Sequence, residues 1–252
     1  MTVPTVGPQL VKLARTLRVP VDDLGYLADV PDVELRQFRM QVADMLFDHQ
    51  AFGLRRMARA AKVIPTPILV KLVGRHHNAL LAAKMSAVLD PGHAVEVAKR
   101  LPVDFLADIA AQLDARHAAT IIAGLPPATV RAVAERLAAR GDWITLGDLM
   151  SSVSDDTARA TVAGLDGVAL TRTAFLVDQA VQLERFVGLV PESKLADMLS
   201  ATADHDLWAE FHTTLAALSP DAVRSVRGAA TGLPTVQRDR ALAEIEGRRV
   251  TE

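Results

Sequence analysis

Apolar residues return along the middle of the chain with a period of twelve positions. Six leucines in a row keep this spacing: Leu89, Leu101, Leu113, Leu125, Leu137 and Leu149. Apolar side chains also stand seven, four and three positions before most of these leucines, and these offsets trace one face of an α-helix. The pattern therefore predicts a series of short helices, each with one apolar stripe. A helix this short is marginal alone in water, so each must bury its stripe against neighbours.

The sequence also predicts where these helices begin. Asp or Pro often follows a repeat leucine, as at Asp90 and Pro102. Asp can cap free backbone N–H groups, and Pro suits the first helical turn. The pattern continues with slips to about Leu233. The steps longer than twelve residues, where longer loops are expected, lie around Gly141 to Asp155, Asp204 and Ser219–Pro220. Two units make one helical hairpin, and stacked hairpins make an α-solenoid.

The first 88 residues lack this repeat. Prolines and acidic caps predict helices over about 6–17, from Asp32 to beyond Gly53, and over 69–89. We interpret residues 1–88 as an N-terminal helical cap; an independent small domain is the alternative. The predicted fold is therefore all-α, an α-solenoid or superhelical stack of short helical hairpins. The cap would span residues 1–88, the short-helix repeat stack 89–247 and a frayed C-terminus 248–252.

The repeats over residues 89–140 resemble a known family. The runs that carry the resemblance are Leu89-Asp90-Pro91, Leu101-Pro102, Leu113-Asp114 and Leu125-Pro126-Pro127. They are similar to the short-helix repeats of the cytosolic N-terminal superhelical domain of bacterial MgtE-type magnesium transporters. In that family the domain regulates a channel by moving against neighbouring domains. The resemblance implies a repeat architecture and not magnesium transport, because these repeats are less acidic than a magnesium-sensing surface.

Composition limits the chemistry. Half of the residues are hydrophobic but only 4% are aromatic, so the core must consist mainly of Ala, Leu, Val and Ile. The chain has no cysteine, which excludes a disulfide framework and a thiolate metal site. No apolar run approaches the roughly 20 residues that span a bilayer, and no signal peptide is recognisable. We expect a cytoplasmic protein.

Linear catalytic motifs are missing. The sequence contains no phosphate-binding loop, no nucleophile elbow and no His-Glu-x-x-His metal motif. Gly164 and Gly167 are expected in a linker between helices. His205 and His212 are seven apart and would share a helical face, but a metal ion needs at least about three ligands. We therefore expect no catalytic residue, no metal, no cofactor and no enzyme; a buried site without a linear motif is the third alternative.

The charge is distributed unevenly. Residues 36–84 hold nine Lys or Arg against two Asp, whereas the whole chain has a net charge of −2. The candidate ligand-binding residues in this basic segment are Arg55, Arg59, Lys62, Lys71, Arg75, His76 and His77. They could hold the head group of an anionic lipid or acyl compound, dock on an anionic membrane surface, or form a solvated face. The ligand hypothesis predicts a cavity lined by Phe47, Phe52, Leu72 and Leu80.

Two functions follow by elimination. The leading hypothesis is a non-enzymatic protein-interaction or regulatory scaffold, because helical repeats expose extended binding surfaces. The alternative is a binder or carrier of a small apolar anionic ligand at the junction of the cap and the repeats. Another protein is therefore the expected partner. No nucleic acid is expected, because the chain is nearly neutral and has a single Tyr for base stacking.

Overall fold

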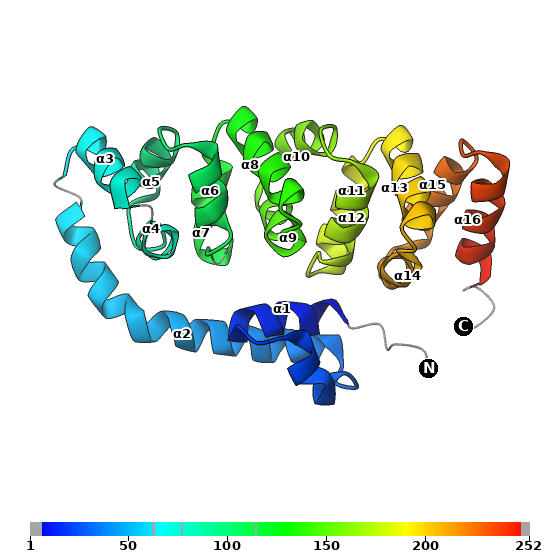
Figure 1. The fold of residues 1–252 in the computed structure, drawn as a ribbon, viewed down its shortest axis with the longest axis horizontal. Coiled ribbons are helices and arrows are strands. Elements are labelled where there is room, and N and C mark those ends of the chain that lie inside the picture. The colour runs from blue at the N-terminus through cyan, green and yellow to red at the C-terminus, as the bar shows by residue number, and fades with distance from the viewer. Residues whose placement is uncertain (1–6, 62–63, 77, 114, 248–252) are drawn as a thin grey trace. The chain divides into compact units, whose positions relative to one another are not determined.

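The computed structural model describes residues 7–61, 64–76, 78–113 and 115–247; for residues 47–61, 76 and 115–117 it describes the backbone alone. Every regular element in these ranges is a helix, which confirms the all-α prediction (Figure 1). The chain divides into two compact units, Met1–Arg136 and Leu137–Glu252. The predicted boundary at residue 88 follows the sequence repeat and stays a prediction.

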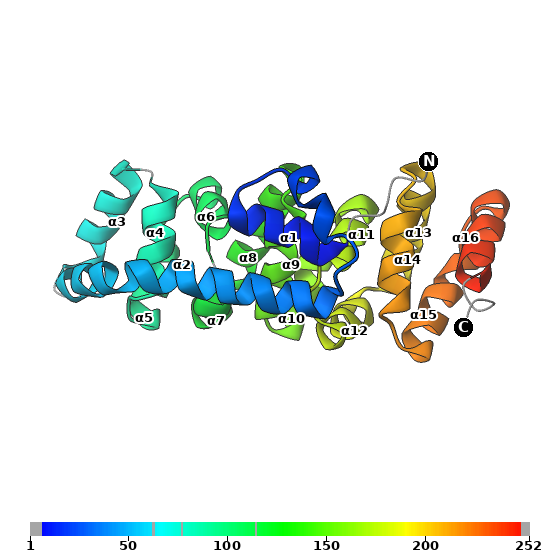
Figure 2. The same cartoon turned by 90° about the horizontal axis from the view of Figure 1, so that it is seen from below.

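The first unit begins with a helical pair. Its helices are α1 (Pro8–Leu17), the 3-10 helix η1 (Val21–Leu27), α2 (Asp32–Ala61), α3 (Thr66–His76), α4 (Ala79–Ser86), α5 (Pro91–Ala98), α6 (Val103–Ala110) and α7 (Ala115–Ala123), with α8 (Pro127–Ala139) crossing into the second unit. Helix α1 lies along the first part of α2 (Figure 2). Leu10, Leu13 and Ala14 of α1 form a small buried core there with Leu24 and Leu35.

In the first unit, helices α2 to α5 each pack on the helix two places further along. Helix α2 contacts α4, α4 contacts α6, α3 contacts α5, and α5 contacts α7. The core of this row contains Ala83, Phe105 and Ile109, with the repeat leucines Leu101 and Leu113 packed half-buried against it. The apolar stripes predicted from the twelve-residue period therefore face these neighbours.

The second unit repeats this alternating pattern. Its helices are α9 (Trp143–Ser152), α10 (Asp155–Val162), α11 (Gly167–Phe175), α12 (Ala180–Leu189), α13 (Glu192–Asp204), α14 (Trp208–Ala216), α15 (Pro220–Ala230) and α16 (Thr235–Gly247). Helices α9, α11, α13 and α15 pack in succession, α10 packs on α12, and α16 packs on α13 and α15. Leu170, Thr173 and Ala174 show the predicted stripe fully buried on α11. The predicted frayed C-terminus, 248–252, lies outside the described residues.

Two predictions about helix boundaries were wrong. The segment 69–89 holds two helices, because Asn78 caps α4: its side-chain oxygen accepts a hydrogen bond from the Leu81 amide at 2.9 Å. The irregular steps also do not lengthen the loops. Helices α8 and α13 each reach 13 residues, while short connections such as 140–142 and 205–207 remain. The residues beyond the twelve-residue step extend α8 and α13, because the last turns of both helices contain no Pro or Gly that would end them.

Side chains from distant helices cap several helix ends in the second unit. Arg185 of α12 donates from Nε to Asp155 Oδ1 at 2.8 Å and from Nη1 to the Met150 carbonyl at 3.1 Å, and Nη2 donates to the Val153 carbonyl. These carbonyls belong to the end of α9, and Asp155 begins α10. One guanidinium therefore ties α12 to the turn between two earlier helices.

Replacing Arg185 with Met should lower the free energy of unfolding by about 1.5–3 kcal/mol, because hydrogen bonds to a charged group are lost and carbonyls are left without them. Arg159→Met is the matched control. Arg159 is exposed, and its partner among the described residues is Asp156 on its own helix. Removing such a pair costs about 0.5 kcal/mol or less. Urea unfolding of both variants measures the difference; equal losses would contradict the capping role of Arg185.

Candidate functional site

The seven predicted ligand-binding residues are only partly placed by the structure. Lys71 and Arg75 lie on α3 with exposed side chains. Arg55 and Arg59 lie in α2, where the backbone alone is described. The side chain of His76 is not described, and Lys62 and His77 lie outside the described residues. The structure therefore brings two of the candidates, Lys71 and Arg75, onto one surface.

That surface is one face of α3. Ile68, Lys71, Leu72 and Arg75 are spaced as i, i+3, i+4 and i+7, so their side chains share a face, which we call the basic α3 face. Ile68 is 58% exposed and Leu72 is 48% exposed. Leu69, about 100° further round the helix than Ile68, is buried. Two aliphatic side chains and two cations therefore lie together on one face of α3, and buried residues such as Leu69 hold the helix in place.

A signal around this face was missed in the sequence. No Asp or Glu occurs in residues 49–89, whereas this stretch holds seven Lys or Arg. The basic segment 36–84 includes Asp44 and Asp48, so its net charge does not show that residues 49–89 contain no acidic residue. Within the described residues, no hydrogen bond or ion pair involves the Lys71 or Arg75 side chain. Both cations are therefore available to an anionic partner.

A second surface lies on α2 and carries no charge. Phe38, Met45 and Leu46 are 48%, 55% and 46% exposed, and Val42 between them is half-buried. These four residues, which we call the α2 apolar stripe, recur at helical spacing after Leu35. They fall within the predicted N-terminal helical cap, residues 1–88. Helix lengths are the signal that could have found Met45 and Leu46: α1 has 10 residues and α2 has 30, about 15 Å against 45 Å.

Exposed apolar side chains gather in the first unit. Among the described residues, the large exposed ones before residue 82 are Leu17, Val19, Tyr26, Val33, Phe38, Met45, Leu46, Ile68, Leu72 and Leu81. The second unit shows two, Val181 and Val236. The apolar positions of the second unit are thus almost all used in its own packing, and surfaces suited to a partner are found in the first.

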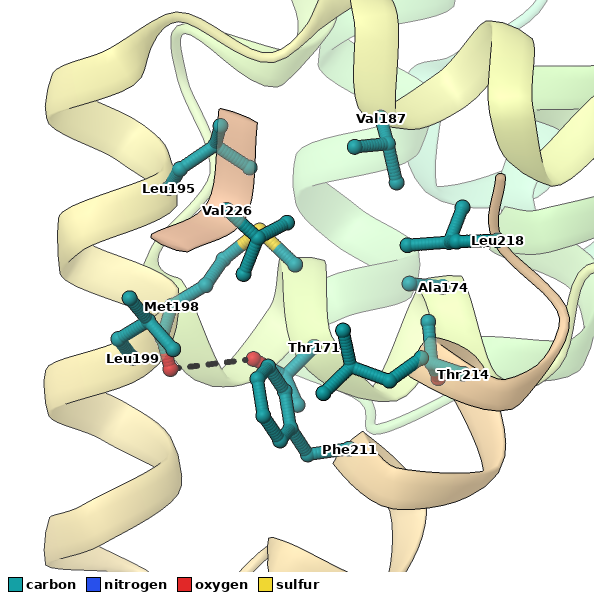
Figure 3. A pocket seen from close by; sticks show the side chains of 11 residues that line it. Thr171, Ala174, Val187, Leu195, Met198, Leu199, Phe211, Thr214, Leu218 and Val226 are labelled. Atoms are coloured by element: carbon teal, nitrogen blue, oxygen red, sulfur yellow. Dashed lines mark hydrogen bonds between the residues drawn. The ribbon is translucent and has the colours of Figure 1, made fainter. Parts of the chain in front are cut away.

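A small cavity lies among the described residues of the second unit (Figure 3). Its walls come from α11 to α15, among them Ala174, Met198, Phe211 and Val226, and are almost entirely apolar. The Thr171 hydroxyl at its edge donates to the Met198 carbonyl at 3.4 Å. The free space is wide enough for about one water molecule. We interpret it as a packing gap. The predicted lining residues Phe47 and Phe52 have side chains outside the described part.

The histidines of the second unit do not share a face. Helix α13 ends at Asp204, His205 caps it, and Asp206 turns the chain with φ of 53°. His212 instead lies on α14, where its Nε2 is 3.0 Å from Glu244 Oε2 of α16. The prediction of a common helical face was wrong because α13 ends before His205 and α14, which carries His212, begins at Trp208. Across the described residues, no cluster of three His, Cys, Asp or Glu could hold a metal ion.

In the described part of the chain, no helix combines the length and the apolar character needed to cross a membrane. Comparison with known protein families, with curated proteins and with solved structures finds no match. Function is therefore inferred from the surfaces of this chain alone.

Proposed function

We propose that this protein is a non-enzymatic protein-interaction or regulatory scaffold whose principal docking surface is the α2 apolar stripe. The observation that carries the proposal is the exposure of Phe38, Met45 and Leu46 on one face of a single helix. A group of large apolar side chains facing water is unfavourable unless a partner covers it, and such surfaces mark interaction sites. Scattered exposed residues, such as Val236, carry no such meaning.

The geometry of the stripe fits a known mode of recognition. Apolar side chains at positions i, i+4, i+7 and i+8 of a helix dock into an apolar groove or against a second helix. The exposed residues beside the stripe, Gln37, Gln41 and Asp44, are polar, as is typical of the rim of an interface. Alternating packing of successive helices supports the solenoid interpretation of the repeats, which would serve as the scaffold that carries this stripe.

The double variant Phe38→Glu/Leu46→Glu tests this proposal. We expect its helix content to match the wild type and its melting temperature to change little, because about half of each side chain already faces water. The affinity for the partner should fall about 30-fold or more, the loss expected at an interface hot spot. Val236→Glu is the matched control, since Val236 is 82% exposed on α16. Quantitative capture and crosslinking compare the three proteins.

Partners that bind the wild type and Val236→Glu but not the double variant would support the proposal. A dimer in light scattering that the double variant converts to monomers would assign the stripe to a second copy. Identical partners and identical mass for all three proteins would overturn the α2 apolar stripe as a docking surface.

The alternative function is a binder or carrier of a small apolar anionic ligand. The specific observation in its favour is the basic α3 face, where Lys71 and Arg75 flank Ile68 and Leu72. Because Leu72 is exposed, this face would meet a ligand at the surface of the first unit. Native mass spectrometry of the purified protein, followed by organic extraction, tests this alternative by detecting a co-purified lipid or acyl compound.

A further inference from the structure

We infer that the basic α3 face docks the protein on an anionic membrane surface. This inference is independent of the proposed scaffold function, because it uses different residues on a different helix. Ile68 and Leu72 supply exposed aliphatic side chains, and Lys71 and Arg75 supply exposed cations between and beside them. This combination on one helical face is the arrangement by which a helix lies in the interface of a lipid bilayer.

The position of α3 in the first unit leaves this face open. Helix α3 begins the row of short helices (Figure 1), and it packs on α5 two places further along. The buried Leu69 and the half-buried Val73, which packs against the core near Phe105, hold the helix from its other side. The face is therefore formed before binding, so docking requires little ordering of the chain.

The aliphatic and the cationic side chains of this face would contact different layers of the membrane surface. Ile68 and Leu72 are short and can enter the boundary between head groups and acyl chains. Lys71 and Arg75 have long aliphatic stems, which lie along the apolar layer while their charged ends reach the phosphates. A single partner surface that is apolar inside and anionic outside satisfies all four residues.

The local charge favours an anionic surface. Residues 49–89 carry seven Lys or Arg and no acid, so no carboxylate in this stretch repels negative lipids. Each Lys or Arg held near such a membrane contributes about fivefold to the affinity. The attraction falls off within a Debye length, about 8–10 Å at physiological salt, so it depends strongly on ionic strength.

A membrane explains this face better than a nucleic acid does. Residues 64–89 contain no Phe, Tyr or Trp on which a base could stack. Phosphate contacts alone would engage Lys71 and Arg75 and leave Ile68 and Leu72 in water. Binding that depends on the aliphatic pair as well as on the cations is therefore the property that separates a bilayer from other polyanions.

Sedimentation of the full chain with vesicles tests the inference. We expect binding to phosphatidylcholine vesicles that contain phosphatidylserine, weak binding to phosphatidylcholine alone, and release by salt. Lys71→Ala/Arg75→Ala should lower the affinity about 25-fold. Lys99→Ala/Arg100→Ala is the matched control, because it removes the same charge from exposed positions that pair with Glu96; it should change the affinity less than about twofold.

Ile68→Ser/Leu72→Ser supplies the second readout. This variant keeps every charge and should lose most vesicle binding, while circular dichroism shows an unchanged fold. Wild-type affinity in either α3 variant, equal loss in the Lys99/Arg100 control, or tight binding of single-stranded RNA that ignores Ile68 and Leu72 would overturn the inference. Phe38→Glu/Leu46→Glu should bind vesicles like the wild type, so failure here and failure of the scaffold proposal are distinguishable.

Discussion

Replacing Gly167 with Ala should lower the free energy of unfolding of the second unit by about 3 kcal/mol or more. This value is the upper end of the usual cost of overpacking. A Cβ atom at this position would lie 2.2 Å from the Asp197 carbonyl oxygen and 2.9 Å from the Ala201 Cβ, both on α13. The first of these contacts is with backbone, which cannot move away by changing a rotamer. Helices α11 and α13 would have to separate, and α11 lies at the centre of the unit.

Gly188→Ala is the matched control and should act in the opposite direction. Gly188 lies within α12 and is exposed, and outside its chain neighbours and the nearby backbone of α12 no atom lies within 4 Å of its added Cβ. Ala is a better helix former there, so stability should rise by about 0.5–1 kcal/mol. Urea unfolding followed by circular dichroism compares the two variants. Similar stability changes of the same sign would show that helix propensity, and not the close approach to α13, governs Gly167.

Gly167 also shows where prediction from sequence ends. Gly164 does lie between α10 and α11 as expected, but Gly167 is the first residue of α11 and is buried. The linker prediction for Gly167 was wrong. In the sequence, a glycine that lets another helix pack closely cannot be told from a glycine that forms a turn. The Asp166 side chain, which accepts from the Ala169 amide at 2.8 Å, is the local signal that α11 had begun.

Which side of each helix is apolar could be predicted from the sequence, because it depends on local geometry. Offsets of seven, four and three positions fix which side of a helix is apolar, whatever lies opposite. In the second unit, for example, Leu183, Phe186 and Val187 hold these offsets before Val190, and all are buried. The period does not say which helix covers the stripe. Contacts such as that between Arg185 and Asp155 join residues 30 apart and have no sequence signature.

The candidate surfaces show the same limit. The sequence identified the basic segment and its cations, but exposure depends on what covers them. Phe38 and Met45 form a regular apolar stripe, which in sequence is typical of a buried helix face. They remain about half exposed in the structure, Phe38 at 48% and Met45 at 55%. Comparing the lengths of adjacent helices is the step that would have turned this pattern into a prediction of an interaction surface.

Replacing Leu170 with Ala should lower the free energy of unfolding of the second unit by about 2–5 kcal/mol, the range for removing a fully buried leucine side chain. Leu170 has no exposed surface, and it lies on α11, which packs on α9, α13 and α14. Three neighbouring helices cannot all close around the missing atoms, so the loss of contacts is joined by a cavity. Thermal and urea unfolding measure the change.

This variant separates two interpretations of the repeat. Leu170 holds the same repeat offset as Ala94 and Ala118, which are both buried in the first unit, so the repeat pattern alone suggests that Ala is tolerated there. Local packing predicts the opposite, because the space around Leu170 is shaped for a larger side chain. Val181→Ala, at an exposed position on the next helix, should change stability by less than about 0.5 kcal/mol. If Leu170→Ala lowers the free energy of unfolding by no more than Val181→Ala does, Ala is tolerated at this position as it is at Ala94 and Ala118. The local packing of α11 would then not govern stability at this position.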